Sequence, residues 1–103
     1  MRIHETKYRD ELNVEAEIDV RFFTRRGDVT DYTVVLLAEE GGAWRAVRVY
    51  DNAHNVNDMH RYNREDEKQP AEMFHSGTAS EALRSAIKTV RDGYSEMIDS
   101  WRG

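Results

Sequence analysis

The sequence predicts an α+β domain: an antiparallel meander of four strands, or five, with one long C-terminal helix packed on one face. Three observations predict it. Apolar residues alternate with polar ones through residues 14–23, as in a half-buried strand. Two further strand-like segments follow, separated by glycine-containing turns. Apolar residues then recur with helical spacing over residues 83–101.

The chain has 103 residues, which corresponds to a single domain over residues 1–103. It contains no cysteine, which excludes a disulfide scaffold and a cysteine-ligated zinc or iron–sulfur site. No uncharged apolar run reaches the ~18 residues of a membrane span, and the charged first twelve residues are unlike a signal peptide. We therefore expect a cytoplasmic protein with no membrane contact, and the sequence indicates no cofactor.

Short, turn-rich connections separate the predicted strands and favour a meander in which each strand is antiparallel to the last. Gly27 supplies the positive φ of the first tight turn, and Gly41-Gly42 forms the second. The segment at residues 32–38 is apolar on both faces and predicts a central strand. The four expected strands are residues 14–23, 32–38, 43–50 and 58–63, with an edge strand at residues 3–8 as the fifth if that segment pairs.

Residues 64–70 are charged and predict a solvated loop, after which the pattern becomes helical. Thr78 and Glu81 fit a capping box, in which the Thr78 hydroxyl accepts from the Glu81 backbone N–H and the Glu81 carboxylate reaches back. The helix predicted over residues 78–101 places its apolar side chains on one face: Leu83, Ile87, Val90, Tyr94, Met97, Ile98 and Trp101.

The net charge is −5, and no segment forms a basic tract. This pattern argues against a duplex-DNA binder, because phosphate contacts supply most of the affinity for DNA. Twelve of the fifteen basic residues are arginine, whose planar fork suits carboxylates, phosphates and stacked bases. Genomic composition is the simpler explanation of that bias.

Side chains of the third predicted strand divide between two faces by alternation. If Val47 and Val49 face the helix, the other set lies on the open face of the sheet beside Phe23: Trp44, Arg48 and Tyr50. Aromatic residues interleaved with arginine occur in base-stacking platforms and in protein–protein hot spots. Given the negative charge, we favour a homodimer interface over RNA binding. The dimer would bury this face or pair an exposed strand edge.

Residues 50–62 carry an unusual density of polar side chains. Turn formation explains many of them, because Asp and Asn bond to nearby backbone and tolerate left-handed geometry. A functional reading is also open, since loops on a rigid scaffold often carry function. In a metal-free ribonuclease, His54 or His60 would act as base or acid, supported by Tyr50 or Tyr62, and Arg48 or Arg61 would clamp the phosphate. That reading requires Asp51, His54, His60 and Arg61 to converge.

Metal binding at the same segment is an alternative. Four residues, with His75, supply enough nitrogen and oxygen ligands for zinc or another divalent ion: Asp51, His54, Asp58 and His60. Their spacing matches no specific ligand motif, so we assign no metal site.

Several segments together resemble a small prokaryotic domain family of unknown function over nearly the whole chain: residues 48–54, 58–62, 68–70, 74–75 and 78–101. The chain is also distantly similar to the TumE-type toxin-like family, whose members carry a Tyr-Asp-Asn element, a His-Arg-His cluster and a C-terminal helix. That similarity implies a component of a toxin–antitoxin pair with a cognate antitoxin-type partner. Here the cluster reads His60-Arg61-Tyr62, with Tyr in place of the second His, so we carry over no catalytic role.

We favour a non-enzymatic interaction or regulatory protein acting as a homodimer, because no complete catalytic constellation is visible. The first alternative is a toxin-like ribonuclease that uses His54, His60 and Arg61. The second is a small metal-dependent hydrolase at the same segment. The residues assigned to binding are Trp44, Arg48, Tyr50, Asp51, Asn52 and Tyr62.

Overall fold

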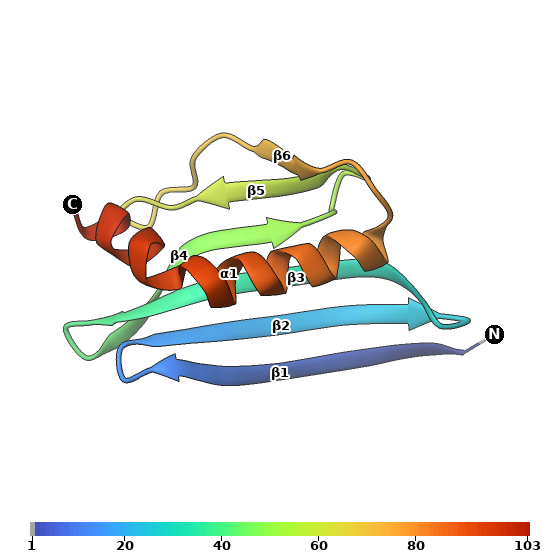
Figure 1. The fold of residues 1–103 in the computed structure, drawn as a ribbon, viewed down its shortest axis with the longest axis horizontal. Coiled ribbons are helices and arrows are strands. Elements are labelled where there is room, and N and C mark those ends of the chain that lie inside the picture. The colour runs from blue at the N-terminus through green and yellow to red at the C-terminus, as the bar shows by residue number, and fades with distance from the viewer. Residues whose placement is uncertain (1) are drawn as a thin grey trace.

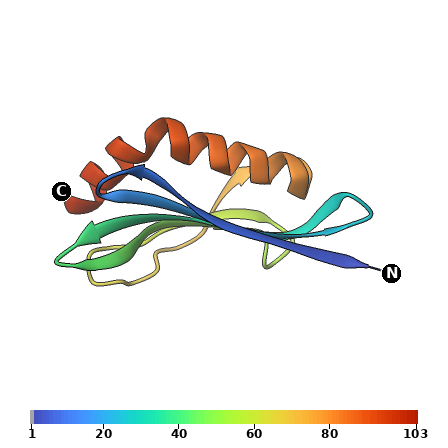
Figure 2. The same ribbon diagram turned by 90° about the horizontal axis from the view of Figure 1, so that it is seen from below.

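Six strands form one antiparallel sheet in the computed structural model, which describes residues 2–103 (Figure 1). They follow each other across the sheet in chain order, and a single helix packs on one face (Figure 2). The elements are β1 (Ile3–Asn13), β2 (Ala16–Arg25), β3 (Asp28–Glu40), β4 (Ala43–Asp51), β5 (Asn57–Arg61), β6 (Glu72–His75) and α1 (Ala79–Arg102).

The fold class and the meander topology are confirmed, but the number of strands is not four or five. The edge strand predicted at residues 3–8 is present as β1 and is longer than expected. The sixth strand, β6, has only four residues. So short a segment shows too little alternation of polar and apolar residues to be distinguished from a loop in the sequence.

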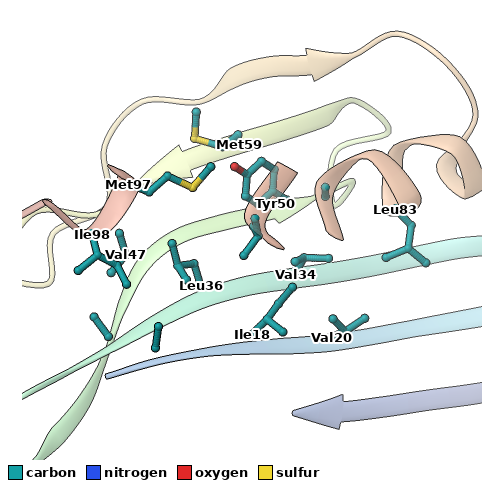
Figure 3. Close-up of a cluster of buried hydrophobic side chains, with 14 of the residues drawn as sticks. Ile18, Val20, Val34, Leu36, Val47, Tyr50, Met59, Leu83, Met97 and Ile98 are labelled. Carbon is teal, nitrogen blue, oxygen red and sulfur yellow. The ribbon is translucent and has the colours of Figure 1, made fainter. Parts of the chain in front are cut away.

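The hydrophobic core lies between α1 and the sheet face that α1 covers (Figure 3). Alternation along β2 and β3 sends every second side chain into this layer, as the sequence predicted for β2 from Ala16 onward. The predicted strand began at residue 14, but Val14 lies in the turn before β2 and is 86% exposed. The buried residues of the core are Ala16, Ile18, Val20, Tyr32, Val34, Leu36, Ala38, Val47, Tyr50, Met59, Ala82, Leu83, Ala86, Val90, Met97, Ile98 and Trp101.

The N-terminus of α1 has the predicted capping box. The Thr78 hydroxyl accepts from the Glu81 backbone N–H at 3.2 Å, and the Thr78 backbone N–H donates to Glu81 Oε1 at 2.9 Å. Ile87 and Tyr94, at the margin of the predicted apolar face, are half-buried rather than buried. Among residues 2–103 there is no helix with the length and apolar character needed to cross a lipid bilayer.

A β-bulge at Val47 changes which side chains of β4 face the helix. Leu36 pairs with Arg48 and Leu37 with Ala46, so Val47 is the extra residue. An extra residue reverses the alternation beyond it. Our expectation that Arg48 and Tyr50 lie on the open face was therefore wrong: both lie on the helix-covered face. Tyr50 is only 2% exposed.

The same bulge moves Val49 to the open face, where it pairs with Val35. Trp44, on the near side of the bulge, does lie on the open face as predicted, and its side chain is 39% exposed. Phe23 also lies on the open face, opposite Asp31. Tyr32, which fitted either face in the sequence, is buried under α1.

Candidate functional site

A cavity of about 680 Å³ lies beside the C-terminal end of α1. It lies on the helix-covered side, between the last turn of α1, the start of β4 and the segment that leaves β5. Five arginines contribute to its wall. The lining residues are Arg45, Val47, Arg48, Arg61, Tyr62, Asn63, Arg64, Glu65, Gln69, Met97, Ser100, Trp101, Arg102 and Gly103.

The Val47 bulge explains why two of these arginines share a face. Arg45 precedes the bulge and pairs with Ala38, whose side chain is buried under the helix. Arg48 follows the bulge and pairs with Leu36, which is also buried there. Arg45 and Arg48 are three positions apart, and in a regular strand residues at that spacing point to opposite faces. The bulge turns both toward the cavity.

Arg61 reaches the cavity through strand pairing. It is the cross-strand partner of Arg48 in the β4–β5 ladder, so the two side chains leave the sheet on the same face. Like charges directly opposite each other destabilise a sheet unless another group compensates them. Arg61 has such a group, since its guanidinium pairs with the Glu72 carboxylate.

Three further arginines of the wall are held by carboxylates outside the lining. Arg45 pairs with Asp66 at 3.2 Å, Arg102 with Glu15 at 3.3 Å, and Arg64 with Glu40. Arg48 differs from all of them. Within residues 2–103, no hydrogen bond or ion pair reaches the Arg48 guanidinium, although the residue is half-buried. The cavity therefore contains one partly desolvated cation whose charge is uncompensated.

Trp101 forms part of the wall and anchors two of the arginines. The guanidinium carbons of Arg64 and Arg45 lie 5.4 Å and 5.7 Å from the centroid of the indole ring, within cation–π range. The indole Nε1–H is buried and has no acceptor among the described residues, so packing and these two cations hold the ring.

Two backbone carbonyls at the C-terminal end of α1 accept hydrogen bonds. The Arg102 carbonyl accepts from Arg64 at 3.2 Å, and the Asp99 carbonyl accepts from the Gly103 N–H at 2.9 Å. A helix C-terminus repels anions through its partial negative charge. Arg64 places a full positive charge at that position, which offsets the repulsion.

These features suit an anion. A guanidinium group carries only hydrogen-bond donors and no acceptor atom. Glu65 contributes the one carboxylate side chain of the lining. Arginine also binds phosphate and carboxylate groups through two parallel hydrogen bonds. Three residues singled out in the sequence, Arg48, Arg61 and Tyr62, line this cavity.

The histidines proposed for catalysis lie elsewhere. His54 is exposed in the loop between β4 and β5. His60 sits on β5 opposite Val49, on the open face, and its Nδ1 lies 2.9 Å from the Gln69 carbonyl oxygen. Arg61, the next residue, leaves the strand on the other face. The structure thus brings His54, His60 and Arg61 to no common point, and the hairpin register explains why.

Nor do the proposed metal ligands come together. Among residues 2–103, no group of three or more His, Asp or Glu side chains is placed to share a metal ion. Asp51 and Asp58 are cross-strand partners at the end of the β4–β5 hairpin, and Asp51 accepts from the Ala53 backbone N–H at 3.2 Å.

The asparagines of residues 50–62 have structural contacts. Asn52 accepts from the Tyr32 backbone N–H at 3.0 Å and donates to the Thr30 carbonyl at 2.9 Å, where the β2–β3 register shifts. Asn57 accepts from the Tyr32 hydroxyl at 2.8 Å and donates to the Gly77 carbonyl at 3.0 Å. Asn55 has a φ of 61°, the left-handed geometry that asparagine tolerates.

A smaller hollow of about 240 Å³ on the open face includes Asp51 and Asn52 together with Arg21, Phe23 and Asp31. Its two carboxylates and single arginine give it no consistent charge preference. Tyr50 does not reach either hollow: its ring packs edge-on against Phe74, with centroids 5.0 Å apart. Trp44 remains exposed on the open face.

Sequence reasoning missed Arg45, Arg64, Trp101 and Arg102 as cavity residues. Trp101 was assigned to the core, and Arg64 to a solvated loop. The arginine bias of the composition was the one available signal, and it carried no positional information. The cavity residues come from four separate parts of the chain, so only the folded structure brings them together.

Comparison with known proteins gives a family but no activity. No curated protein and no solved structure matches this chain. A family model described as a domain of unknown function, DUF7718, matches residues 2–102, which is nearly the whole chain. The expectation of a small domain family without known function is thus confirmed, and the chain belongs to the DUF7718 family.

Proposed function

We propose that this protein is a non-enzymatic binding domain whose arginine-lined cavity holds a small phosphorylated ligand. The observation that carries the proposal is the pair Arg48 and Arg61: two arginines face each other across the β4–β5 ladder, and Arg48 has no anionic partner among the described residues. A bound phosphate would supply the missing negative charge between them.

The size and charge of the cavity support a small multivalent anion. A volume of about 680 Å³ falls within the range of about 300–1,000 Å³ that is typical of small-molecule sites. It exceeds what a single phosphate group needs. Arg45, Arg64 and Arg102, each of which is paired with a carboxylate outside the lining, extend the row of guanidinium donors beyond the Arg48–Arg61 pair, so a ligand with two phosphate groups could contact several guanidiniums at once.

Binding without catalysis is favoured by the lining chemistry. The cavity wall contains no histidine and no cysteine, the residues whose ordinary pKa values lie closest to neutrality. Arginine remains protonated throughout the physiological range and cannot act as a base there. The wall is therefore equipped to hold charge rather than to transfer protons.

The test is titration of the protein with inorganic pyrophosphate, ADP and succinate, followed by calorimetry and by thermal unfolding. We expect saturable binding of the two phosphorylated probes, weaker binding of the dicarboxylate, and a salt-dependent affinity. Arg48→Gln removes a charged donor, whose loss costs about 1.5–3 kcal/mol, so affinity should fall roughly 10- to 100-fold.

Arg84→Gln is the matched control, because Arg84 is exposed on α1 and lies outside the cavity lining. It should bind like the parent. Absence of saturable binding by any phosphorylated probe at millimolar concentration would refute the proposal, as would equal losses in Arg48→Gln and Arg84→Gln. Recovery of ADP as AMP, or cleavage of added single-stranded RNA, would show an enzyme instead.

A further inference from the structure

We propose that two copies of this chain associate through β1, paired antiparallel about Thr6, so that the two sheets become one continuous sheet. The proposal concerns the opposite edge of the sheet from β6 and does not depend on the arginine cavity. It selects one of the two dimer modes expected from the sequence, strand-edge pairing, over burial of the open face.

The first observation is the length and exposure of the edge. β1 is the outermost strand of the sheet and has 11 residues, whereas the other edge strand, β6, has four. Every residue from Ile3 to Arg9 is exposed. This part of β1 extends past the start of α1 (Figure 2). Backbone N–H and C=O groups along such an edge are a template for pairing with another strand.

Protective features are few along this edge. β1 contains no proline, and its pairing with β2 is regular from Ile3 to Glu11. Proteins commonly protect edges with proline, bulges or charge. Charge is the feature present here, so the arrangement of charges decides whether a second copy is repelled or accepted.

Symmetry limits how the strand can pair with itself. Outward-pointing backbone groups alternate along a strand, so residues placed opposite each other in a two-fold antiparallel pair must have the same parity. The two-fold axis therefore passes through a residue rather than between two residues. An axis at any residue from Glu5 to Arg9 keeps at least five residues of β1 paired, and an axis at Asp10 or Glu11 would set that carboxylate against itself.

Only one of these five centres avoids like charges. Pairing about Glu5, Lys7 or Arg9 sets each of those charged residues against itself. Pairing about Tyr8 sets Glu5 against Glu11. Pairing about Thr6 places Thr6 against Thr6 and Glu5 against Lys7, with the second Glu5–Lys7 pair generated by symmetry. Opposite charges across strands stabilise a sheet, and like charges destabilise it.

Lys7 provides an independent reason for this register. Its cross-strand neighbour within the chain is Arg21, a like charge. The available carboxylate of Glu5 already pairs with Arg21. No ion pair or hydrogen bond among residues 2–103 reaches the Lys7 ammonium. In the Thr6-centred dimer, the partner's Glu5 lies opposite Lys7, so each Glu5 carboxylate would be shared between Arg21 of its own chain and Lys7 of the other.

The dimer can be tested by disulfide mapping, because the natural chain has no cysteine. In Thr6→Cys the two Cα atoms would lie about 4.5–5.5 Å apart, within the range that a disulfide spans. In His4→Cys and Tyr8→Cys the equivalent atoms would lie about 13 Å apart, at four residues of strand rise. A mixture of these two variants should crosslink, since residues 4 and 8 oppose each other.

We expect the natural chain to scatter light at near twice 12.1 kDa at micromolar concentration. We also expect Thr6→Cys to form a covalent dimer at least ten times faster than His4→Cys or Tyr8→Cys alone. A monomeric mass for the natural chain would overturn the proposal. Equal crosslinking rates at the three positions, or fastest crosslinking at Tyr8→Cys, would overturn the register.

Charge exchange gives a second test that does not require oxidation. Glu5→Lys and Lys7→Glu should each weaken the dimer about tenfold. The double variant Glu5→Lys/Lys7→Glu restores opposite charges across the interface, so its dimer affinity should return to within threefold of the parent. Melting temperatures of the variants show whether each still folds. A double variant weaker than both single variants would contradict the pairing.

Iodide quenching separates edge pairing from burial of the open face. Trp44 is exposed on that face, whereas Trp101 is buried. Edge pairing leaves Trp44 accessible, so the dimer should retain an iodide-quenchable fluorescence that the Trp44→Phe variant lacks. Protection of Trp44 on dimerisation would place the interface on the open face and refute edge pairing.

Discussion

Arg48 on β4 and Arg61 on β5 lie directly opposite each other on the helix-covered face of the sheet, and only Arg61 has a carboxylate partner among the described residues. A folded chain gains no stability from two facing guanidiniums. Their proximity depends on the Val47 bulge, which turns Arg48 away from the open face. The stability of the fold therefore does not explain the arrangement, and the phosphorylated ligand proposed above would compensate the charge of Arg48.

Replacing Arg48 should therefore leave the fold as stable as before. Arg48→Met keeps much of the side-chain length and removes the charge that faces Arg61. We expect the free energy of unfolding in urea to stay the same or to rise by about 0.5 kcal/mol, the scale of cross-strand pair effects. The same variant should lose pyrophosphate binding. A loss of stability above about 1 kcal/mol would indicate that Arg48 has a structural role.

Leu83 tests the packing of α1 on the sheet. Its side chain is 5% exposed and belongs to the core. Leu83→Ala should lower the free energy of unfolding by about 2–5 kcal/mol, the usual cost of truncating a packed leucine. Thr89→Ala, on the exposed side of the same helix, is the control and should change stability little. Similar small effects of both variants would remove Leu83 from the core.

The capping box should give a pH-dependent contribution to stability. The backbone hydrogen bond from Thr78, followed by the one from its hydroxyl, holds the pKa of the Glu81 carboxyl below its ordinary value of 4.5. A lowered pKa means that the folded state favours the ionised carboxyl. Its contribution is therefore complete above about pH 4.5 and disappears as the pH falls through the lowered pKa.

Urea unfolding of the parent and of Glu81→Gln at several pH values measures that contribution. The two proteins should differ at pH 7 and converge in acid. Thr78→Ala removes the hydroxyl acceptor and should cost about 1 kcal/mol at neutral pH. A difference between the parent and Glu81→Gln that stays constant down to pH 2 would show that the carboxylate charge is not involved.

Tyr32 should resist ionisation. Burial, followed by the nearby Asp51 and Asp58 carboxylates, raises the pKa of the Tyr32 phenol well above its ordinary value of 10.0. Because the folded state favours the neutral phenol, Tyr32 contributes its full stabilisation below about pH 10. This contribution is lost as the pH rises through the raised pKa. Ultraviolet titration of the folded protein should therefore contain a tyrosine ionisation step well above pH 10.0.

Tyr32→Phe identifies the resistant group and tests its hydrogen bond. The variant removes the donor to Asn57 Oδ1, so we expect a loss of about 0.5–1.5 kcal/mol, a typical value for one hydrogen bond. Its ultraviolet titration should lack the late-ionising tyrosine. Persistence of that late step in Tyr32→Phe would assign it to another residue.

Asn52 and His54 separate structure from chemistry in the β4–β5 hairpin. Asn52→Ala leaves a backbone donor of Tyr32 and a carbonyl of Thr30 without partners, which should cost about 1–3 kcal/mol. His54 is exposed in the same loop, so His54→Ala should unfold at the parent's urea concentration. A destabilised His54→Ala would mean that the histidine has a contact beyond those seen here.

Local patterns determined much of this fold. The alternation along β2 and the capping box at Thr78 each depend on residues close together in the chain, whose hydrogen bonds and faces follow from backbone geometry. The turn preference of Asn55 is also local. These features could be predicted because a few neighbouring residues are enough to form them.

The candidate site could not be predicted in this way. Either alternation of β4 is compatible with its sequence, and pairing with β3 selects the one that contains the Val47 bulge. Arg64 and Arg102 lie 38 positions apart and meet only when α1 has packed on the sheet. The sequence by itself determined the helix, the strands up to β5 and the excess of arginine, but not the four-residue strand β6. Tertiary structure decided which arginines face each other, because strand register and helix docking are set by packing over the whole domain.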